Sequence, residues 1–153
     1  MMKLFGILMT LLVAVIANAA STDYVGEITQ ARLLEEHEKF ARNYASYQPS
    51  EQELEQIKVL AQKDILIMFG TWCHDSKREV PRFLKLLDTS QVPLASLTLQ
   101  TVDRDKNEPT GVAEQNNLKY TPTFVVFENK VEVARIIEKP QKTLARDFYE
   151  QLD

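Results

Sequence analysis

The sequence predicts an α/β domain. Apolar runs of strand length alternate with stretches whose apolar residues recur every three or four positions, and a hairpin pattern precedes a final helical stretch. The chain has 153 residues, of which 44% are hydrophobic, and it contains no internal repeat and no linker long enough to separate two domains. We expect an export segment over residues 1–19, a helical extension over 20–49 and the α/β domain over 50–153.

The first residues have the pattern of a cleavable signal peptide. Met1–Lys3 carries one positive charge, Leu4–Ile16 is almost continuously apolar, and Ala17-Asn18-Ala19 has the small residues that a signal peptidase recognises. An uncleaved anchor is the alternative, but this apolar run is short for the roughly 30 Å of a bilayer core. We predict cleavage after Ala19, no stable membrane insertion afterwards, and a periplasmic or secreted protein.

The charge balance excludes two classes of partner. The chain has 18 Lys and Arg against 22 Asp and Glu, a formal net charge of −4. Such a chain offers no broad basic surface to follow a phosphate backbone or to cover an anionic membrane. We therefore expect no nucleic-acid partner.

The apolar pattern of the N-terminal extension predicts one amphipathic helix over residues 28–47. Its apolar face would contain Leu33, His37, Phe40 and Tyr44. We expect His37 to be a packed, hydrogen-bonded histidine, because it lies on that face. Pro49 would end the helix.

The remaining elements follow in order. Ser50 and Glu53 form a capping box at the start of a second helix. Residues 65–69 are too short for a helix and apolar on both faces, as in a central strand. We then expect a helix from Cys73, a strand over 94–102, a short helix over 110–117 capped by Thr110, a hairpin of strands 124–127 and 131–137 with Asn129 in a left-handed conformation, and a helix over 143–152.

Three motifs resemble the thioredoxin-like fold. Trp72-Cys73-His74-Asp75-Ser76, between a buried strand and a helix, is similar to the Trp-Cys-x-x-Cys active-site segment. Pro81 is similar to the proline in the family's active-site helix, and Tyr120-Thr121-Pro122-Thr123 resembles its cis-proline loop. The resemblance covers residues 50–152 and implies a central mixed sheet of four or five strands flanked by helices. It also implies that Trp72, Thr121 and Pro122 contact the substrate.

Cys73 is the only cysteine, and its position predicts a reactive thiol. A sulfur at the first turn of a helix faces unpaired amides and the positive end of the helix dipole, which favour the thiolate. Protonated His74 would add to this effect, Asp75 would oppose it, and the Ser76 hydroxyl could donate to the thiolate.

Two departures from the family pattern restrict this chemistry. Ser76 stands in the place of the second cysteine, so a mixed disulfide on Cys73 has no internal thiol to release it. Ile67 and Met68 occupy the candidate positions of the family's buried carboxylate. The resemblance therefore implies monothiol exchange with protein or glutathione mixed disulfides, completed by an external reductant such as glutathione, with no bound cofactor.

Several alternatives remain open at this stage. The groove of Cys73 and Pro122 could capture client proteins without turnover, or Cys73 could be a buried structural thiol. Asp103, Asp105, Asn107 and Glu114 have calcium-loop spacing. However, Glu108 occupies the position where such a loop needs glycine, so we expect no metal.

Overall fold

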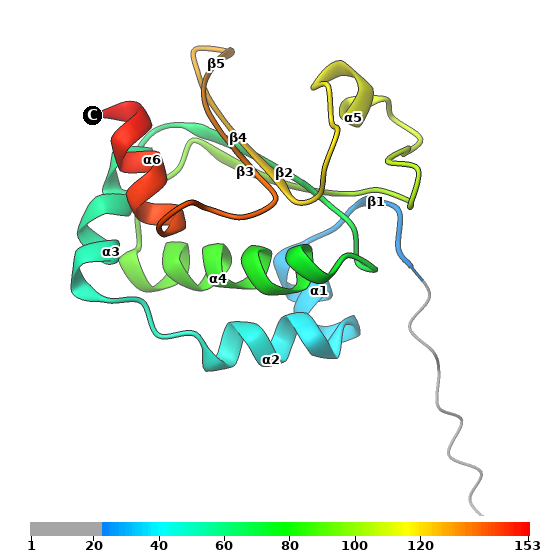
Figure 1. Ribbon diagram of the computed structural model, residues 1–153, viewed down its shortest axis with the longest axis horizontal. Coiled ribbons are helices and arrows are strands. Elements are labelled where there is room, and N and C mark those ends of the chain that lie inside the picture. The colour runs from blue at the N-terminus through cyan, green and yellow to red at the C-terminus, as the bar shows by residue number, and fades with distance from the viewer. Residues whose placement is uncertain (1–22) are drawn as a thin grey trace, which may run out of the picture.

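The computed structural model describes residues 23–153, and its elements surround a single sheet (Figure 1). The predicted signal peptide lies outside the described residues. The elements are β1 (Gly26–Glu27), α1 (Gln30–Glu36), α2 (Glu38–Ser46), α3 (Glu51–Gln56), the 3-10 helix η1 (Ile57–Leu60), β2 (Asp64–Phe69), α4 (His74–Ser90), β3 (Ser96–Thr101), α5 (Val112–Gln115), β4 (Thr123–Glu128), β5 (Val131–Ile137) and α6 (Leu144–Leu152). None of the helices described is long and apolar enough to span a bilayer.

The sheet is mixed and has the strand order β1-β3-β2-β4-β5. β2 pairs in parallel with β3 and antiparallel with β4, and β4 forms an antiparallel hairpin with β5. These pairings confirm the predicted α/β class, with a mixed sheet of five strands and β2 at its centre.

The two faces of the sheet bury different clusters, because side chains along β2 alternate between them. Ile65, Ile67 and Phe69 join the main core. Leu66 and Met68 belong to a smaller cluster with residues of and around α5. In the main core Phe83 of α4 packs against Phe124 and Phe148, with ring centroids 5.3 and 5.8 Å apart. This packing fixes α4 along one face of the sheet.

The single helix predicted over residues 28–47 is wrong, since α1 ends at Glu36 and α2 begins at Glu38. The break lies at His37, whose φ of −123° and ψ of 89° are not helical. It allows helices of different direction to bury both Leu33 and Phe40 completely. Figure 1 shows α2 outside α4, on the side away from the sheet.

The N-terminal segment also contributes to the sheet and to the core. Gly26 and Glu27 pair antiparallel with the end of β3 and form the edge strand β1. Ile28, Leu33 and Phe40 belong to the main core. Residues 26–49 are therefore packed as part of the same unit as the rest of the described chain.

Two helix starts show how far local signals hold. Ser50 and Glu53 form the predicted capping box. The predicted Thr110 cap is wrong: α5 starts at Val112 after Gly111, which has a φ of +76°. The Glu108 carboxylate instead accepts hydrogen bonds from the amides of Thr110 (2.6 Å) and Ala113 (3.1 Å).

The remaining predicted elements are present with small changes in length. β3 and α6 lie inside their predicted ranges. The hairpin turn has Asn129 at φ 52°, which confirms its predicted left-handed conformation, and Lys130 follows at φ 67°. Pro81 lies inside α4.

Candidate functional site

Cys73 lies between the central strand and the longest helix described. It is the N-cap of α4, and its φ of −77° and ψ of 131° are extended. Its amide donates to the Gly70 carbonyl (3.0 Å) and its carbonyl accepts from the Lys77 amide (3.1 Å). Cys73 is a free cysteine, and the residue is only partly buried. The strand, turn, cysteine and helix therefore follow one another as the sequence predicts.

Trp72 covers the turn and has a fixed orientation. The indole Nε1 donates to the Val102 carbonyl at 3.0 Å. The Arg104 guanidinium lies 5.4 Å from the ring centroid, within cation–π range. Gly70 lies directly against the ring, since a Cβ at this position would be 2.4 Å from Trp72 Cε2. Gly70 is needed here for a close approach rather than for a positive φ.

The loop before β4 reaches the sulfur from the other side. The Cys73 thiol donates to the Thr121 carbonyl, with a distance of 3.2 Å from Sγ to O. The Thr121–Pro122 peptide bond is cis. The Pro122 carbonyl accepts from the Glu138 amide (2.7 Å) and the Thr123 hydroxyl donates to the Tyr120 carbonyl (2.7 Å). Two segments about 50 residues apart in the sequence thus meet at one sulfur atom.

Ser76 is bonded to the backbone at the end of the central strand. It is fully buried, and its Oγ accepts a hydrogen bond from the Gly70 amide at 3.3 Å. A hydroxyl that accepts one hydrogen bond keeps its own proton to donate, so the donation from Ser76 to the Cys73 sulfur stays a prediction. Ser76 therefore ties the first turn of α4 to the end of β2, because it occupies the side of the helix that faces the sheet.

The charges around Cys73 form a short network. The Asp75 carboxylate pairs with Arg78 at 2.8 Å, and Arg78 also pairs with Glu79. These two acids raise the pKa of Arg78, and the largest cause is the hydrogen bond of Arg78 to Glu79. The pairing offsets the negative charge that Asp75 brings to the start of the helix. His74 is exposed to solvent.

Several residues of this site were not predicted from the sequence. Lys77 Nζ donates to the Trp72 carbonyl at 3.3 Å, and its spacing of four residues from Cys73 was a usable signal. Val102, Arg104 and Gly70 touch Trp72. The first two had no signal, because they reach the indole only through the pairing of β2 with β3.

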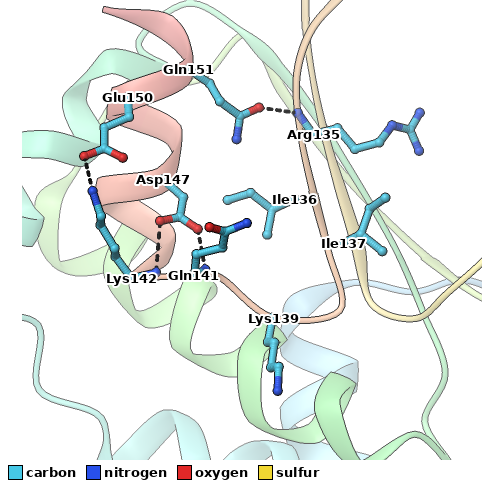
Figure 2. A pocket seen from close by; sticks show the side chains of 9 residues that line it. All are labelled: Arg135, Ile136, Ile137, Lys139, Gln141, Lys142, Asp147, Glu150 and Gln151. Atoms are coloured by element: carbon cyan, nitrogen blue, oxygen red, sulfur yellow. Dashed lines mark hydrogen bonds and ion pairs between the residues drawn. The ribbon is translucent and has the colours of Figure 1, made fainter.

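A cavity of about 450 Å³ lies between β5 and α6 and is lined by other residues than those around Cys73 (Figure 2). Its polar groups bond one another. Asp147 accepts from the amides of Gln141 and Lys142, and Lys142 Nζ donates to Glu150. The Gln151 side-chain oxygen accepts a hydrogen bond from the backbone amide of Arg135. Within residues 23–153, no group of three or more His, Cys, Asp or Glu side chains could hold a metal ion.

Comparison with known proteins decides the family. The family model described as thioredoxin matches residues 23–151. The chain belongs to the thioredoxin family. The match begins before residue 50, so it includes the N-terminal helices that the three sequence motifs do not reach.

The thioredoxin of Mycoplasma genitalium is 33% identical over 90 residues, which cover 58% of this chain and 82% of that protein. Two solved structures have a similar fold. An HIV epitope scaffold has a TM-score of 0.55 and 16% identity, covering 76% of this chain and 74% of the scaffold. A protein of unknown function from Pseudomonas aeruginosa has a TM-score of 0.51 and 13% identity, covering 82% and 92%.

Membership of the thioredoxin family indicates thiol-disulfide redox chemistry, and the position of Cys73 agrees with it. This thioredoxin-family chain differs from the Trp-Cys-x-x-Cys pattern at Ser76.

Proposed function

We propose that this protein catalyses monothiol exchange with protein or glutathione mixed disulfides through Cys73. One observation carries the proposal: the partly exposed Cys73 Sγ lies at the start of α4 and 3.2 Å from the Thr121 carbonyl of the proline loop. The proposed nucleophile and the backbone of the proposed substrate-binding loop are therefore adjacent. Trp72, Thr121 and Pro122 are the proposed substrate contacts.

The exchange proceeds in two balanced steps. The Cys73 thiol first gives its proton to solvent water, which breaks the hydrogen bond to Thr121 and leaves the thiolate as the nucleophile. It attacks one sulfur of the substrate disulfide, so that a new bond to Cys73 forms, the old disulfide bond breaks, and the second sulfur leaves as a thiolate that takes up a proton. An external thiol such as glutathione then attacks the mixed disulfide, releases Cys73 and becomes part of the new disulfide.

An external thiol is required because the chain has no other cysteine. Ser76 occupies the place from which a second sulfur would attack, and its hydroxyl is buried against Gly70. A serine hydroxyl cannot replace this sulfur, because thiol-disulfide exchange requires attack by a thiolate. The proposed cycle therefore stops at the mixed disulfide when no low-molecular-weight thiol is present.

The test compares three variants on a glutathionylated protein substrate. We expect Cys73→Ser to reduce exchange to the background rate, and wild type to need added glutathione for turnover. Ser76→Cys should release the mixed disulfide without glutathione, whereas Ser76→Ala, a matched control that adds no sulfur, should not. Turnover by Cys73→Ser, or wild-type turnover without an external thiol, would exclude the proposal.

A client-binding module without turnover is the second candidate, and the exposed Tyr120 of the proline loop favours it. Tyr120 is 56% exposed, so its ring is accessible to a partner, and tyrosine is among the residue types enriched in binding hot spots. In this case Cys73→Ser should retain its clients after reduction. In an exchange enzyme the clients should be recovered only through the disulfide to Cys73.

We also propose that the protein is exported. The charged start, the apolar run and Ala17-Asn18-Ala19 support this. N-terminal sequencing of the protein from the periplasm or medium should begin at Ala20. Recovery of the full-length chain from the cytoplasm alone would contradict export.

A further inference from the structure

His37 is an unusual histidine for a protein core. The residue is only 8% exposed, and its Nε2 is the one buried side-chain nitrogen or oxygen in residues 23–153 without a hydrogen-bond partner. The sequence predicted a hydrogen-bonded histidine, and for this nitrogen the prediction is wrong. Buried polar groups are nearly always paired, so an unpaired one requires a reason.

His37 lines a cavity that extends to the active-site segment. The cavity has a volume of about 130 Å³, and it is lined by His37, Glu38, Lys39, Phe40, Thr71 and Lys77. Thr71 comes directly before Trp72, and its Oγ1 accepts a hydrogen bond from the Tyr24 amide. The α1–α2 junction and the segment around Cys73 are therefore opposite walls of one small space.

Two connections run from this space to the nucleophile. Lys77 Nζ donates to the Trp72 carbonyl (3.3 Å), while the Lys77 amide donates to the Cys73 carbonyl (3.1 Å). In addition, Asn43 of α2 donates to the Lys77 carbonyl at 2.6 Å. Hydrogen bonds therefore link α2 to the first turn of α4.

The charges that face His37 come from every element packed around it. Burial lowers the pKa of His37; Arg32 on α1 and Lys77 on α4 lower it further, whereas Glu36 and Asp23 raise it. Glu36 is paired with Arg32, Glu38 of α2 with Arg42, and Asp23 with Arg104, while Lys39 adds a second cation to the cavity wall. A proton on His37 therefore places a new positive charge beside two lysines.

We propose that His37 is a positioning residue that acts through Lys77. The neutral imidazole keeps the α1–α2 junction closed against the segment Thr71–Lys77, and protonation opens the junction and displaces Trp72 and Cys73. The junction can open without breaking a helix, since the chain is already non-helical at residue 37. As a consequence, exchange at acid pH should be slower than the thiolate fraction of Cys73 alone predicts, and this part of the inference rests on the proposed function. The displacement of Trp72 does not.

The test uses the fact that the chain has one tryptophan and two histidines. In the double variant Cys73→Ser/His74→Gln, His37 is the only remaining histidine and there is no thiolate to quench Trp72. We expect the fluorescence of Trp72 to change with pH with a midpoint below about 6.5, the ordinary value for histidine. Adding His37→Gln to the double variant should abolish this transition, while the circular dichroism spectrum remains that of a folded protein.

A flat fluorescence profile in the double variant, or a transition that survives His37→Gln, overturns the inference. If His37→Gln does not fold, NMR of the double variant decides: the His37 Cε1–H and the Trp72 indole N–H should titrate with one midpoint, and different midpoints overturn it. An inert Cys73 in wild type with the fluorescence transition intact would reject the proposed function alone. The rate of thiol-disulfide exchange gives a further check. Between about pH 7.5 and about pH 5.5, after correction for the thiolate fraction, the rate of wild type should fall about threefold more than the rate of His37→Gln.

Discussion

The two segments that meet at the Cys73 sulfur are held in different ways. The turn of residues 70–76 is fixed by its own side chains, through one bond within the turn and one to the backbone just after β3. The Gly70 amide donates to Ser76 Oγ, and Trp72 Nε1 donates to the Val102 carbonyl. The proline loop of residues 119–123 depends on its pairing with the sheet, and Tyr120 at its outer side is largely exposed. Damage to the turn should therefore cost stability as well as reactivity, and damage to the loop mainly client contact.

The largest effect is expected for Gly70→Ala. The new Cβ would lie 2.4 Å from Trp72 Cε2 and force the indole away from its bond to Val102. We expect a loss of about 3 kcal/mol in the free energy of unfolding and slower alkylation of Cys73. Urea unfolding measures the first effect. In a Trp72→Ala background the same change should cost much less, and an equal cost in both backgrounds would rule out this clash.

Ser76→Ala tests the second bond within the turn. It leaves the buried Gly70 amide without an acceptor, at a cost of about 2 kcal/mol by urea unfolding. Ser46→Ala, on the exposed end of α2, is the control and should change stability by less than about 0.5 kcal/mol. Equal effects of the two changes would show that the Ser76 bond does not hold the turn.

Thr123→Val tests the proline loop by removing the bond of Thr123 to the Tyr120 carbonyl. Valine keeps the shape and suits a strand, so we expect a loss of about 1 kcal/mol in stability and a weaker client affinity. Thr98→Val on β3 is a control away from the loop. If Thr123→Val costs more stability than Ser76→Ala, the contrast between the two segments is wrong.

Tyr120→Ala should have the smallest effect on folding. The exposed ring contributes little to the core, so the free energy of unfolding should change by no more than about 0.5 kcal/mol. Client affinity should fall while alkylation of Cys73 by a small reagent stays the same. Slower alkylation would show that Tyr120 also positions the sulfur.

Local patterns predicted the parts of the fold that depend on neighbouring residues. The capping box at Ser50, the left-handed Asn129 and the order of strand, turn, Cys73 and helix were all visible as short motifs. The break at His37 was not, because Leu33, His37 and Phe40 keep the helical period across it. The start of α5 was missed too, since the capping carboxylate of Glu108 comes from outside the short helix.

The sequence by itself determined the class of the fold and the place of the one cysteine at a helix start, because periodicity and short motifs are local properties. Only the tertiary structure decided what surrounds that sulfur. The approach of Thr121, the Val102 bond that orients Trp72 and the burial of Ser76 against Gly70 all depend on strand pairing and helix packing between residues far apart in the chain. Sequence spacing carries no information about such contacts until the sheet has brought the segments together.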